Sequence, residues 1–263
     1  MRTSNVQRPT SNVERKDTAS MSSTSKLDVG RWTLDVRILK RPSILIASWT
    51  IAFIVALLLD ARVAEFARSS GLARTVEGSR WAQIIKISGT FWFTLAVAGL
   101  LWLFRRAGWK SSAFVIFAGI LSGTNGLVKW IVGRTRPFKL PGTFDLRPFE
   151  FHPFWHGISG FFNQRDLSFP SGHECTAAAL AAAIAIVWPR GAWVFICLAI
   201  LVGIERVAEN AHYLSDVVAA AGFSVLCVAL LNQALSSWIK MPKKPVFLVA
   251  VPPMQAGSGT LES

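Results

Sequence analysis

Phe-Pro-Ser-Gly-His-Glu, residues 169–174, marks the point where a polar segment turns into a long apolar run. Ser171 can cap a helix here, and Glu174 can complete a capping box, so free backbone N–H groups and the positive end of the helix dipole gather at one place. Such a helix start suits phosphate. Gly172 lets the backbone approach a ligand closely, and His173 adds a proton that is mobile near neutral pH. The stretch predicts an anion site at the start of a helix, with a capped helix and a solvated imidazole as the alternative.

The composition is that of an integral membrane protein. The 263 residues include 11 tryptophans and only 16% charged residues, and the mean hydropathy is +0.41. A net charge of +13 would suggest nucleic acid as the partner of a soluble protein, but the basic residues lie in the tails and between apolar segments, as membrane topology requires. We therefore expect no nucleic-acid partner. The cysteines lie inside apolar runs without paired spacing and are interpreted as core residues (Cys175, Cys197 and Cys227).

Six apolar segments predict an all-α fold, an integral membrane bundle of six transmembrane helices. They are Ile44–Leu59, Ile87–Phe104, Ser112–Val128, His173–Trp188, Ala192–Ile204 and Leu214–Leu231. Several are shorter than the roughly 20 residues that a full crossing needs, so we expect the helix ends to extend into flanking polar residues. The expected parts of the chain are a basic disordered cytoplasmic tail (1–42), the six-helix membrane domain (43–238) with a long periplasmic loop (130–169), and a second cytoplasmic tail (239–263).

The distribution of basic residues predicts the orientation. An even number of spans places both tails on one side of the membrane, and the basic residues before the first span make that side cytoplasmic by the positive-inside rule. The basic link Arg62–Lys86 counts against this orientation but is outweighed by the N-terminal excess. Lys129, His173 and the segment between the last two spans then lie at the opposite, periplasmic face.

A second polar group at this face contains Lys129 and Arg136. They are seven residues apart, so a straight helix would place them on nearly the same face, about 10 Å apart along the axis, where two cations could converge on one anion. Pro137 disfavours helix at Arg136, so we expect the helix to fray there. Snorkelling of Lys129 at a helix end is the alternative.

A third polar group contains Arg206, His212 and Asp216. His212 and Asp216 are four residues apart and would share one face of a helix, where the carboxylate can hold an imidazole nitrogen. That pair is typical of a nucleophilic or basic histidine, and an exposed pair at a helix start is the alternative. Arg206 would point elsewhere on a continuous helix, so we expect a break near Glu209 and Asn210. Together the three groups supply positive charge, a nucleophile and an acid, which phosphoryl transfer needs.

Lys129-x6-Arg136-Pro137, Pro170-Ser171-Gly172-His173 and Arg206-x5-His212-x3-Asp216, in this order, resemble the three signature motifs of the type 2 phosphatidic acid phosphatase (PAP2) superfamily of membrane lipid phosphatases. The resemblance covers residues 129–216 and the six-helix layout. It implies that His212 is the nucleophile that forms a phosphohistidine, Asp216 its orienting partner and His173 the general acid. It implies a phosphate cradle, and neither a metal nor a cofactor; the cradle residues are Lys129, Arg136, Ser171, Gly172 and Arg206.

One residue departs from the family pattern. The third motif usually has Ser before the arginine, and here that position is Glu205. A carboxylate that pointed into the phosphate site would repel the substrate, so we expect Glu205 to face away from it.

The segment from Phe138 to Phe169 is rich in aromatic residues that suit a membrane interface. We hypothesise that it forms a lid or rim that admits a lipid sideways from the bilayer, with an ordinary amphipathic loop as the alternative. His152 and His156 are four residues apart but have no nearby third ligand, so we interpret them as interfacial residues rather than a metal site.

The leading hypothesis is therefore a metal-independent phosphatase of the bacterial inner membrane, which hydrolyses a phosphomonoester or diphosphate of a membrane lipid at the periplasmic face. Candidate substrates are phosphatidic acid, phosphatidylglycerol phosphate, undecaprenyl diphosphate and a lipid A phosphate. A lipid phosphotransferase needs the same residues. The predicted spans disfavour a soluble vanadate haloperoxidase, and the intact His212, His173 and Asp216 disfavour a non-catalytic lipid-binding or transport protein. The sequence leaves the lipid and the oligomeric state open.

Overall fold

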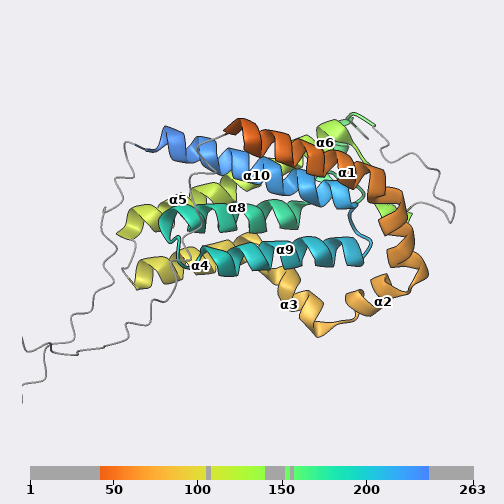
Figure 1. Cartoon of the computed structure of the whole chain (residues 1–263), viewed down its shortest axis with the longest axis horizontal. Coiled ribbons are helices and arrows are strands. Elements are labelled where there is room, and N and C mark those ends of the chain that lie inside the picture. Colours follow the sequence, from red (N-terminus) through yellow and green to blue (C-terminus); the bar gives the residue numbers. More distant parts are fainter. Residues whose placement is uncertain (1–41, 105–107, 140–151, 155–156, 237–263) are drawn as a thin grey trace, which may run out of the picture. The chain divides into compact units, whose positions relative to one another are not determined.

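The computed structural model describes residues 42–104, 108–139, 152–154 and 157–236. These residues are helical apart from connections and one isolated antiparallel bridge between Thr135 and Leu167. The predicted tails, the middle of the predicted loop (140–151) and His156 lie outside the described residues. The elements, in order, are α1 (Pro42–Ser69), α2 (Leu72–Glu77), α3 (Arg80–Ser88), α4 (Phe91–Leu103), α5 (Gly108–Ser122), α6 (Asn125–Val132), the 3-10 helix η2 (Pro137–Lys139), α7 (Gly157–Phe162), α8 (Gly172–Val187), α9 (Ala192–Ala208) and α10 (Leu214–Ala234) (Figure 1).

Each predicted apolar segment contains a helix, but three of them differ from the prediction. The third contains the junction between α5, which ends at Ser122, and α6, which starts at Asn125. The first helix runs ten residues past Leu59, to Ser69. The second segment is divided, because Gly89 ends α3 and Thr90 starts a new helix by accepting a hydrogen bond from the Phe93 backbone N–H. The axes of α3 and α4 differ by 65° across this break. The bend turns α3 out of the direction of the bundle.

The chain is a multi-pass membrane protein by the length and composition of its helices. Three helical stretches are long and apolar enough to cross a membrane, namely Ser43–Ser69, Gly108–Val132 and Leu214–Ala234. A fourth results if the bent pair α3 and α4 forms one span, and α8 is a shorter apolar helix. That all six long helices cross the membrane stays a prediction.

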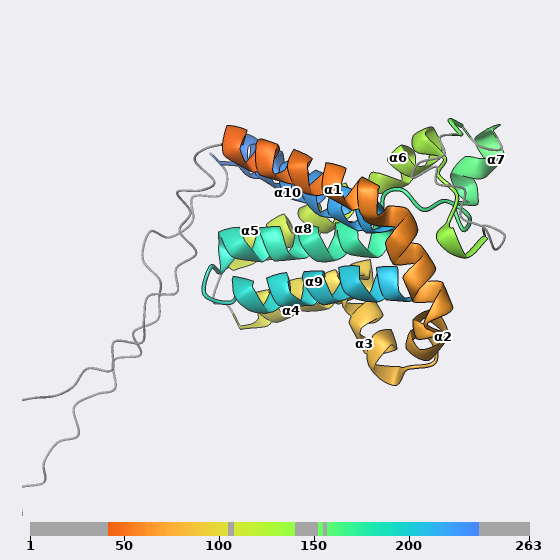
Figure 2. The ribbon, with the colours of Figure 1, turned by 45° about the vertical axis from the view of Figure 1, so that its right-hand side comes forward.

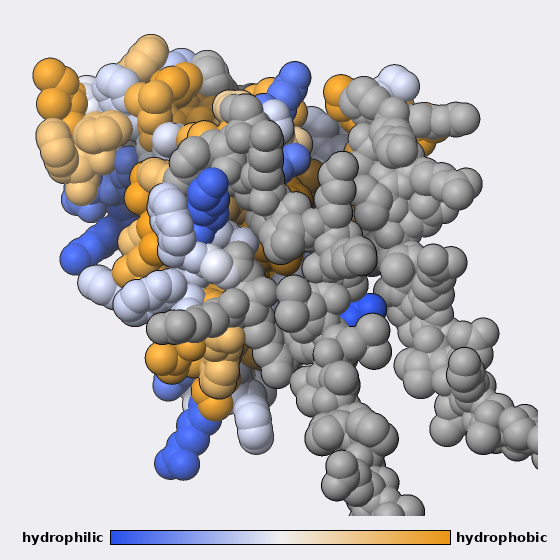
Figure 3. All heavy atoms as spheres, turned by 90° about the vertical axis from the view of Figure 1, so that its left-hand side faces the viewer, coloured by the Kyte–Doolittle hydropathy of each residue, from blue (hydrophilic) through white to orange (hydrophobic). Residues whose placement is uncertain are grey.

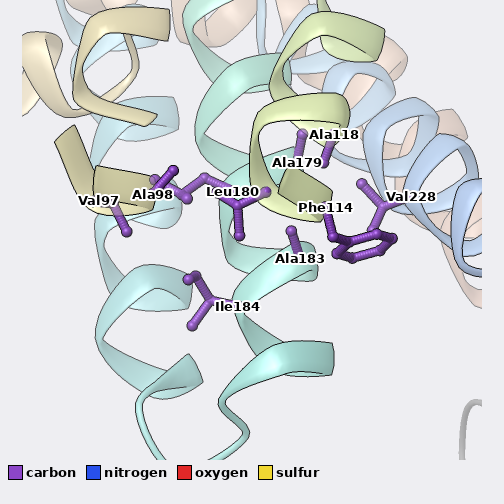
Figure 4. Packing of buried hydrophobic residues seen from close by; sticks show 10 residues of the cluster. Val97, Ala98, Phe114, Ala118, Ala179, Leu180, Ala183, Ile184 and Val228 are labelled. Carbon is purple, nitrogen blue, oxygen red and sulfur yellow. The ribbon is translucent and has the colours of Figure 1, made fainter. Parts of the chain in front are cut away.

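The helix α8 lies at the centre of the bundle and packs against α9, α10 and α5 (Figures 1 and 2). Alanines form much of its buried surface, and such small side chains let neighbouring helices approach closely. Figure 4 shows the main apolar cluster, where side chains from α4, α5, α8 and α10 meet. Its buried members are Val97, Ala98, Phe114, Val115, Ala118, Ala179, Leu180, Ala183, Ile184 and Val228.

Large apolar side chains also lie on the outside of the bundle. Leu58 on α1 and Trp92 on α4 are 73% and 78% exposed, and orange apolar residues stand among blue polar ones on the face shown in Figure 3. A water-soluble bundle would bury residues of this kind, whereas lipid tails solvate them. The outer surface therefore agrees with a bundle that sits in a bilayer.

Candidate active site

The three predicted polar groups come together at one end of the bundle. The bridge between Thr135 and Leu167 aligns the segment after α6 with the segment before α8. Within it, Ser168 N–H donates to the Arg134 carbonyl at 2.7 Å. The start of α8 is tied to α10 in turn, because Ser171 N–H donates to the Asp216 carbonyl at 3.2 Å. These backbone contacts join the segments that carry the first, second and third groups, and Arg206 is tied to them because its carbonyl accepts from the His212 N–H at 3.3 Å.

His212 lies in the connection between α9 and α10. The predicted break is confirmed: α9 ends at Ala208, Asn210 has a φ of 59°, and Tyr213 is the N-cap of α10. His212 therefore precedes the helix, and the prediction that it shares a helix face with Asp216 is wrong. Its side chain is 2% exposed, at the meeting point of the three groups.

The shortest contact of the His212 ring is with a backbone carbonyl. Nδ1 lies 2.8 Å from the Ser168 oxygen and 3.6 Å from Asp216 Oδ2. A carbonyl oxygen only accepts, so Nδ1 carries the proton and Nε2 keeps its lone pair. Ser168 thus holds the ring and fixes its tautomer, while Asp216 acts on it as a nearby negative charge.

The imidazole of His212 is neutral at pH 7. Burial lowers the pKa of His212 to about 3, against the opposing effect of Asp216, and the positive charges of Lys129 and Arg136 lower it further. A neutral ring with a free Nε2 lone pair is the form in which a histidine acts as a nucleophile.

A buried ionic network holds Asp216 in place. Arg134 Nη1 donates to Asp216 Oδ1 at 2.7 Å, and Nη2 donates to Asp60 Oδ2 at 2.8 Å. Ser215 links the same groups, because its Oγ accepts from Arg134 at 2.8 Å and its backbone N–H donates to Asp60 Oδ1 at 2.9 Å. Tyr213 N–H completes the bonding of Asp216 by donating to Oδ2 at 2.9 Å. Arg134 is 1% exposed and both aspartates are fully buried, and each charged group has an ion-pair partner inside the protein.

Lys129 and Arg136 converge as predicted, although the helix between them does not continue. The helix α6 ends at Val132, and Gly133 takes a left-handed φ of 66°. Both side chains nevertheless point at the same carbonyl, since Lys129 Nζ lies 3.4 Å and Arg136 Nε 3.2 Å from the Leu167 oxygen. Lys129 is only 6% exposed, so it does not snorkel.

Gly133 is required by a close approach as well as by its φ. A Cβ atom at this position would lie 1.8 Å from the carbonyl oxygen of His152. The chain before α7 therefore lies directly on the turn that carries Arg134 and Arg136.

The start of α8 offers hydrogen-bond donors, but the predicted capping box is wrong. Ser171 is the N-cap by position, yet its side chain makes no capping bond, and among the described residues its buried Oγ has no partner. Gly172 is the first helical residue and His173 the second. Glu174 is buried toward α9, where a Cβ on Gly203 would lie 3.1 Å from its Oε2. The Ser171 hydroxyl and the first-turn N–H groups are thus left for a ligand.

His173 is surrounded by positive charge. The charges of Arg206, Lys86, Lys129 and Arg136 act on its ring. Burial lowers the pKa of Arg136, and the positive charge of Arg206 lowers it further. Repulsion between closely spaced cations makes the site favourable for an anion.

The expectation that Glu205 faces away from the site is wrong. Its carboxylate is 5% exposed and accepts from Arg206 Nε and Nη2, both at 2.5 Å. Glu209 also contacts Arg206 Nη2, and Lys86 from α3 lies 3.1 Å from Glu209. The physical reason is burial: Arg206 is only 3% exposed, and a buried guanidinium needs a counter-charge.

The helix α7 is fastened to α6 by one tryptophan. Trp130 Nε1 donates to the Gly157 carbonyl at 2.8 Å, and its ring meets Phe154 and Phe161 edge-on at 4.7 and 5.8 Å. Beyond these contacts α7 exposes large apolar side chains, with Ile158 76% and Phe162 82% exposed. Figure 2 shows α7 beside α6, the helix that ends the candidate span Gly108–Val132.

Sequence reasoning missed four residues of the site, namely Asp60, Arg134, Ser168 and Ser215. Two of them carry a recognisable signal. Asp60 is a carboxylate at the end of an apolar run, and Arg134 is a second arginine within Gly-Arg-Thr-Arg-Pro. Charges beside hydrocarbon are expensive and require partners, which the structure provides. Ser168 acts through its backbone carbonyl and carries no such signal.

Comparisons with known proteins show which sequences and structures the chain resembles. The PAP2 superfamily model matches residues 107–240, just over half of the chain. Lipid A 1-phosphatases of Rhizobium etli and Rhizobium johnstonii are each 40% identical to this chain over 111 aligned residues. The alignment covers 41% of this chain, 42% of the Rhizobium etli protein and 40% of the Rhizobium johnstonii protein. The match spans about two fifths of the length of these relatives. The crystal structure of a transmembrane PAP2 type phosphatidylglycerolphosphate phosphatase from Bacillus subtilis has a TM-score of 0.48 and 19% identity, covering 74% of this chain and 96% of that one.

Proposed function

The chain belongs to the PAP2 superfamily, and from this premise we propose that it is a metal-independent phosphatase that removes a phosphate group from a membrane lipid through a phosphohistidine at His212. The observation that carries the proposal is the 2.8 Å contact between His212 Nδ1 and the Ser168 carbonyl. It directs the proton to Nδ1 and leaves the Nε2 lone pair for attack on phosphorus.

In the first half of the proposed reaction, Nε2 of His212 attacks the lipid phosphate. The P–N bond forms as the P–O bond to the lipid breaks, and His173 protonates the oxygen that leaves. His212 gains positive charge in this step, and the nearby Asp216 carboxylate stabilises it. Arg134 holds that carboxylate on its other oxygen.

In the second half, a water molecule attacks the phosphohistidine. His173 takes the proton of the water, the P–N bond breaks, and inorganic phosphate is released with His212 restored. Transfer to another lipid would use the same residues with a hydroxyl in place of water.

The equatorial phosphate oxygens carry the charge that the site has to stabilise in both steps. Lys129 and Arg136 face the same carbonyl, so they approach the phosphate from one side. Ser171 Oγ and the first-turn N–H groups of α8 approach it from another, and Arg206 comes from the end of α9. No step of the proposed reaction needs a metal ion.

A lipid substrate fits the apolar surroundings of the site. We propose that the lipid reaches it sideways across α7, whose exposed Ile158 and Phe162 would lie in the interfacial layer of the bilayer. The contacts of Trp130 fasten α7 to α6, which favours a fixed rim over a lid that opens. We also propose that six helices cross the membrane and that the site faces the periplasm.

The substrate class is proposed from the relatives, whose names give the 1-phosphate of lipid A as the group on which those proteins act. The test is phosphate release from lipid A, phosphatidic acid, phosphatidylglycerol phosphate and undecaprenyl diphosphate in micelles that contain EDTA. We expect the full chain to release phosphate from at least one of them, and His212→Ala to release none. Glu77→Ala, at an exposed carboxylate on α2, is the control and should keep the wild-type rate. If neither the wild type nor His212→Ala released phosphate from any of these lipids, the proposal would be contradicted.

A further inference from the structure

Among the residues that the structure describes, Arg206 is the cation of the proposed cradle that pairs with carboxylates. Glu205 accepts from two of its nitrogens, and Glu209 contacts one of the same nitrogens. Lys86 pairs with Glu209 at 3.1 Å. These two cations and two carboxylates carry no net charge, so the net attraction on a phosphate comes from Lys129 and Arg136.

Glu205 is buried, so its negative charge acts strongly on Arg206. Glu205 is 5% exposed and Arg206 is 3% exposed, so water screens neither charge well. Glu209 is the looser of the two carboxylates, because its side chain is 16% exposed and shared with Lys86. Among the residues that the structure describes, Arg206 is the sole ion-pair partner of Glu205.

We infer that Glu205 sets the phosphate affinity of the site. As a fixed counter-ion of Arg206, it weakens the binding of inorganic phosphate and so favours release of the product that the proposed reaction forms. The inference rests on the proposed function, because it takes the groups around Arg206 to be a phosphate cradle. A carboxylate this close offsets much of the attraction of a guanidinium, and its repulsion grows with the charge of the ligand. The residue is therefore an affinity-determining residue of the same site.

The test measures binding of inorganic phosphate to the purified full chain in detergent by isothermal titration calorimetry. Glu205→Gln keeps the size of the side chain and removes its charge, and Glu205→Ser introduces the residue that the resembling family usually carries there. We expect both variants to bind phosphate about tenfold more tightly than the wild type, with a lower KM and stronger inhibition by product. Glu205→Asp, which keeps the charge, should stay close to the wild type. Glu77→Gln, at an exposed carboxylate on α2, is the control for a change of net charge and should have no effect.

Unchanged or weaker phosphate binding in both neutral variants would overturn the inference, because Glu205 would then only hold Arg206 in position. Tighter binding without lipid turnover by any form of the protein would support the inference and contradict the proposed function. Lipid turnover that depends on His212, combined with equal phosphate affinity in all Glu205 variants, would support the proposed function and contradict the inference about Glu205. Absence of phosphate binding in the wild type and in both neutral variants would overturn the cradle and with it both proposals.

Discussion

The guanidinium of Arg134 donates a 2.7 Å hydrogen bond to the carboxylate of Asp216, a residue 82 positions further along the chain. The same guanidinium reaches Asp60 on α1 at 2.8 Å. One buried side chain therefore ties the first helix, the turn after α6 and the start of α10 together directly behind His212. Stability and the proposed chemistry depend on the same contact.

Replacement of Arg134 by Met should destabilise the fold strongly. It would leave Asp60 and Asp216 buried without their shared counter-charge, and loss of one partner of a buried ionic pair costs about 3 to 5 kcal/mol. We expect a large drop in the thermal midpoint in detergent. Arg80→Met, at an exposed arginine on α3, is the matched control and should unfold like the wild type. Equal midpoints for Arg134→Met and the control would contradict the role of the network.

Replacement of Gly89 by Ala should slow catalysis. A Cβ at Gly89 would lie 2.9 Å from the His173 carbonyl oxygen and 3.0 Å from the His173 Cβ, so the start of α8 has to shift. A displaced acid loses its alignment with the substrate, and we expect kcat to fall about 10- to 100-fold.

Gly99→Ala provides the comparison for this prediction, because a Cβ at Gly99 meets nothing within 4 Å. Its kcat should equal that of the wild type. If both alanine variants turned over lipid at the same rate, the contact between Gly89 and His173 would have no bearing on the reaction.

The stability of the protein should depend on pH through His212. The folded-state pKa is lowered from 6.5 to about 3, so between these pH values the unfolded chain binds a proton that the folded chain does not. The contribution of the neutral ring is therefore complete above pH 6.5 and is lost as the pH falls toward 3. The thermal midpoint of His212→Gln should accordingly fall less between pH 7 and pH 4 than that of the wild type. Parallel midpoint curves for the two proteins would show that His212 is not buried in its neutral form.

Removal of the apolar side chains of α7 should affect lipids selectively. We expect Ile158→Ala combined with Phe162→Ala to raise the KM for a lipid phosphate in vesicles severalfold, and to leave the hydrolysis of a water-soluble aryl phosphate unchanged. The reason is that these side chains would contact the bilayer and not the phosphate. Leu230→Ala, at an exposed apolar residue near the C-terminal end of α10, controls for a general loss of apolar surface. A parallel loss of activity on both substrates would contradict a role in lipid access.

Much of the helical layout could be predicted from the sequence, because apolar segments separated by polar residues have few other solutions in a membrane. The six predicted segments all contain helices, and the break after α9 lies where the position of Arg206 required it. The bend between α3 and α4 was missed, since Gly89 and Thr90 sit inside an otherwise continuous apolar pattern.

The site was harder to predict where the structure uses contacts that carry no residue signature. His212 is held by the backbone carbonyl of Ser168, and any residue supplies a carbonyl. Glu205 was expected to turn away on the argument of charge repulsion from the substrate. The buried Arg206 needs a counter-charge of its own, and this local requirement outweighs the repulsion between Glu205 and a phosphate.

The most direct test of the account is detection of the phosphorylated residue itself. The full chain would be mixed with a lipid phosphate, quenched within milliseconds under alkaline conditions that preserve phosphohistidine, digested and examined by mass spectrometry. The account predicts a phosphoryl group on His212 in the wild type and no phosphohistidine in His212→Gln. Phosphate on a different residue, or lipid turnover by the wild type with no phosphohistidine, would contradict the proposed role of His212.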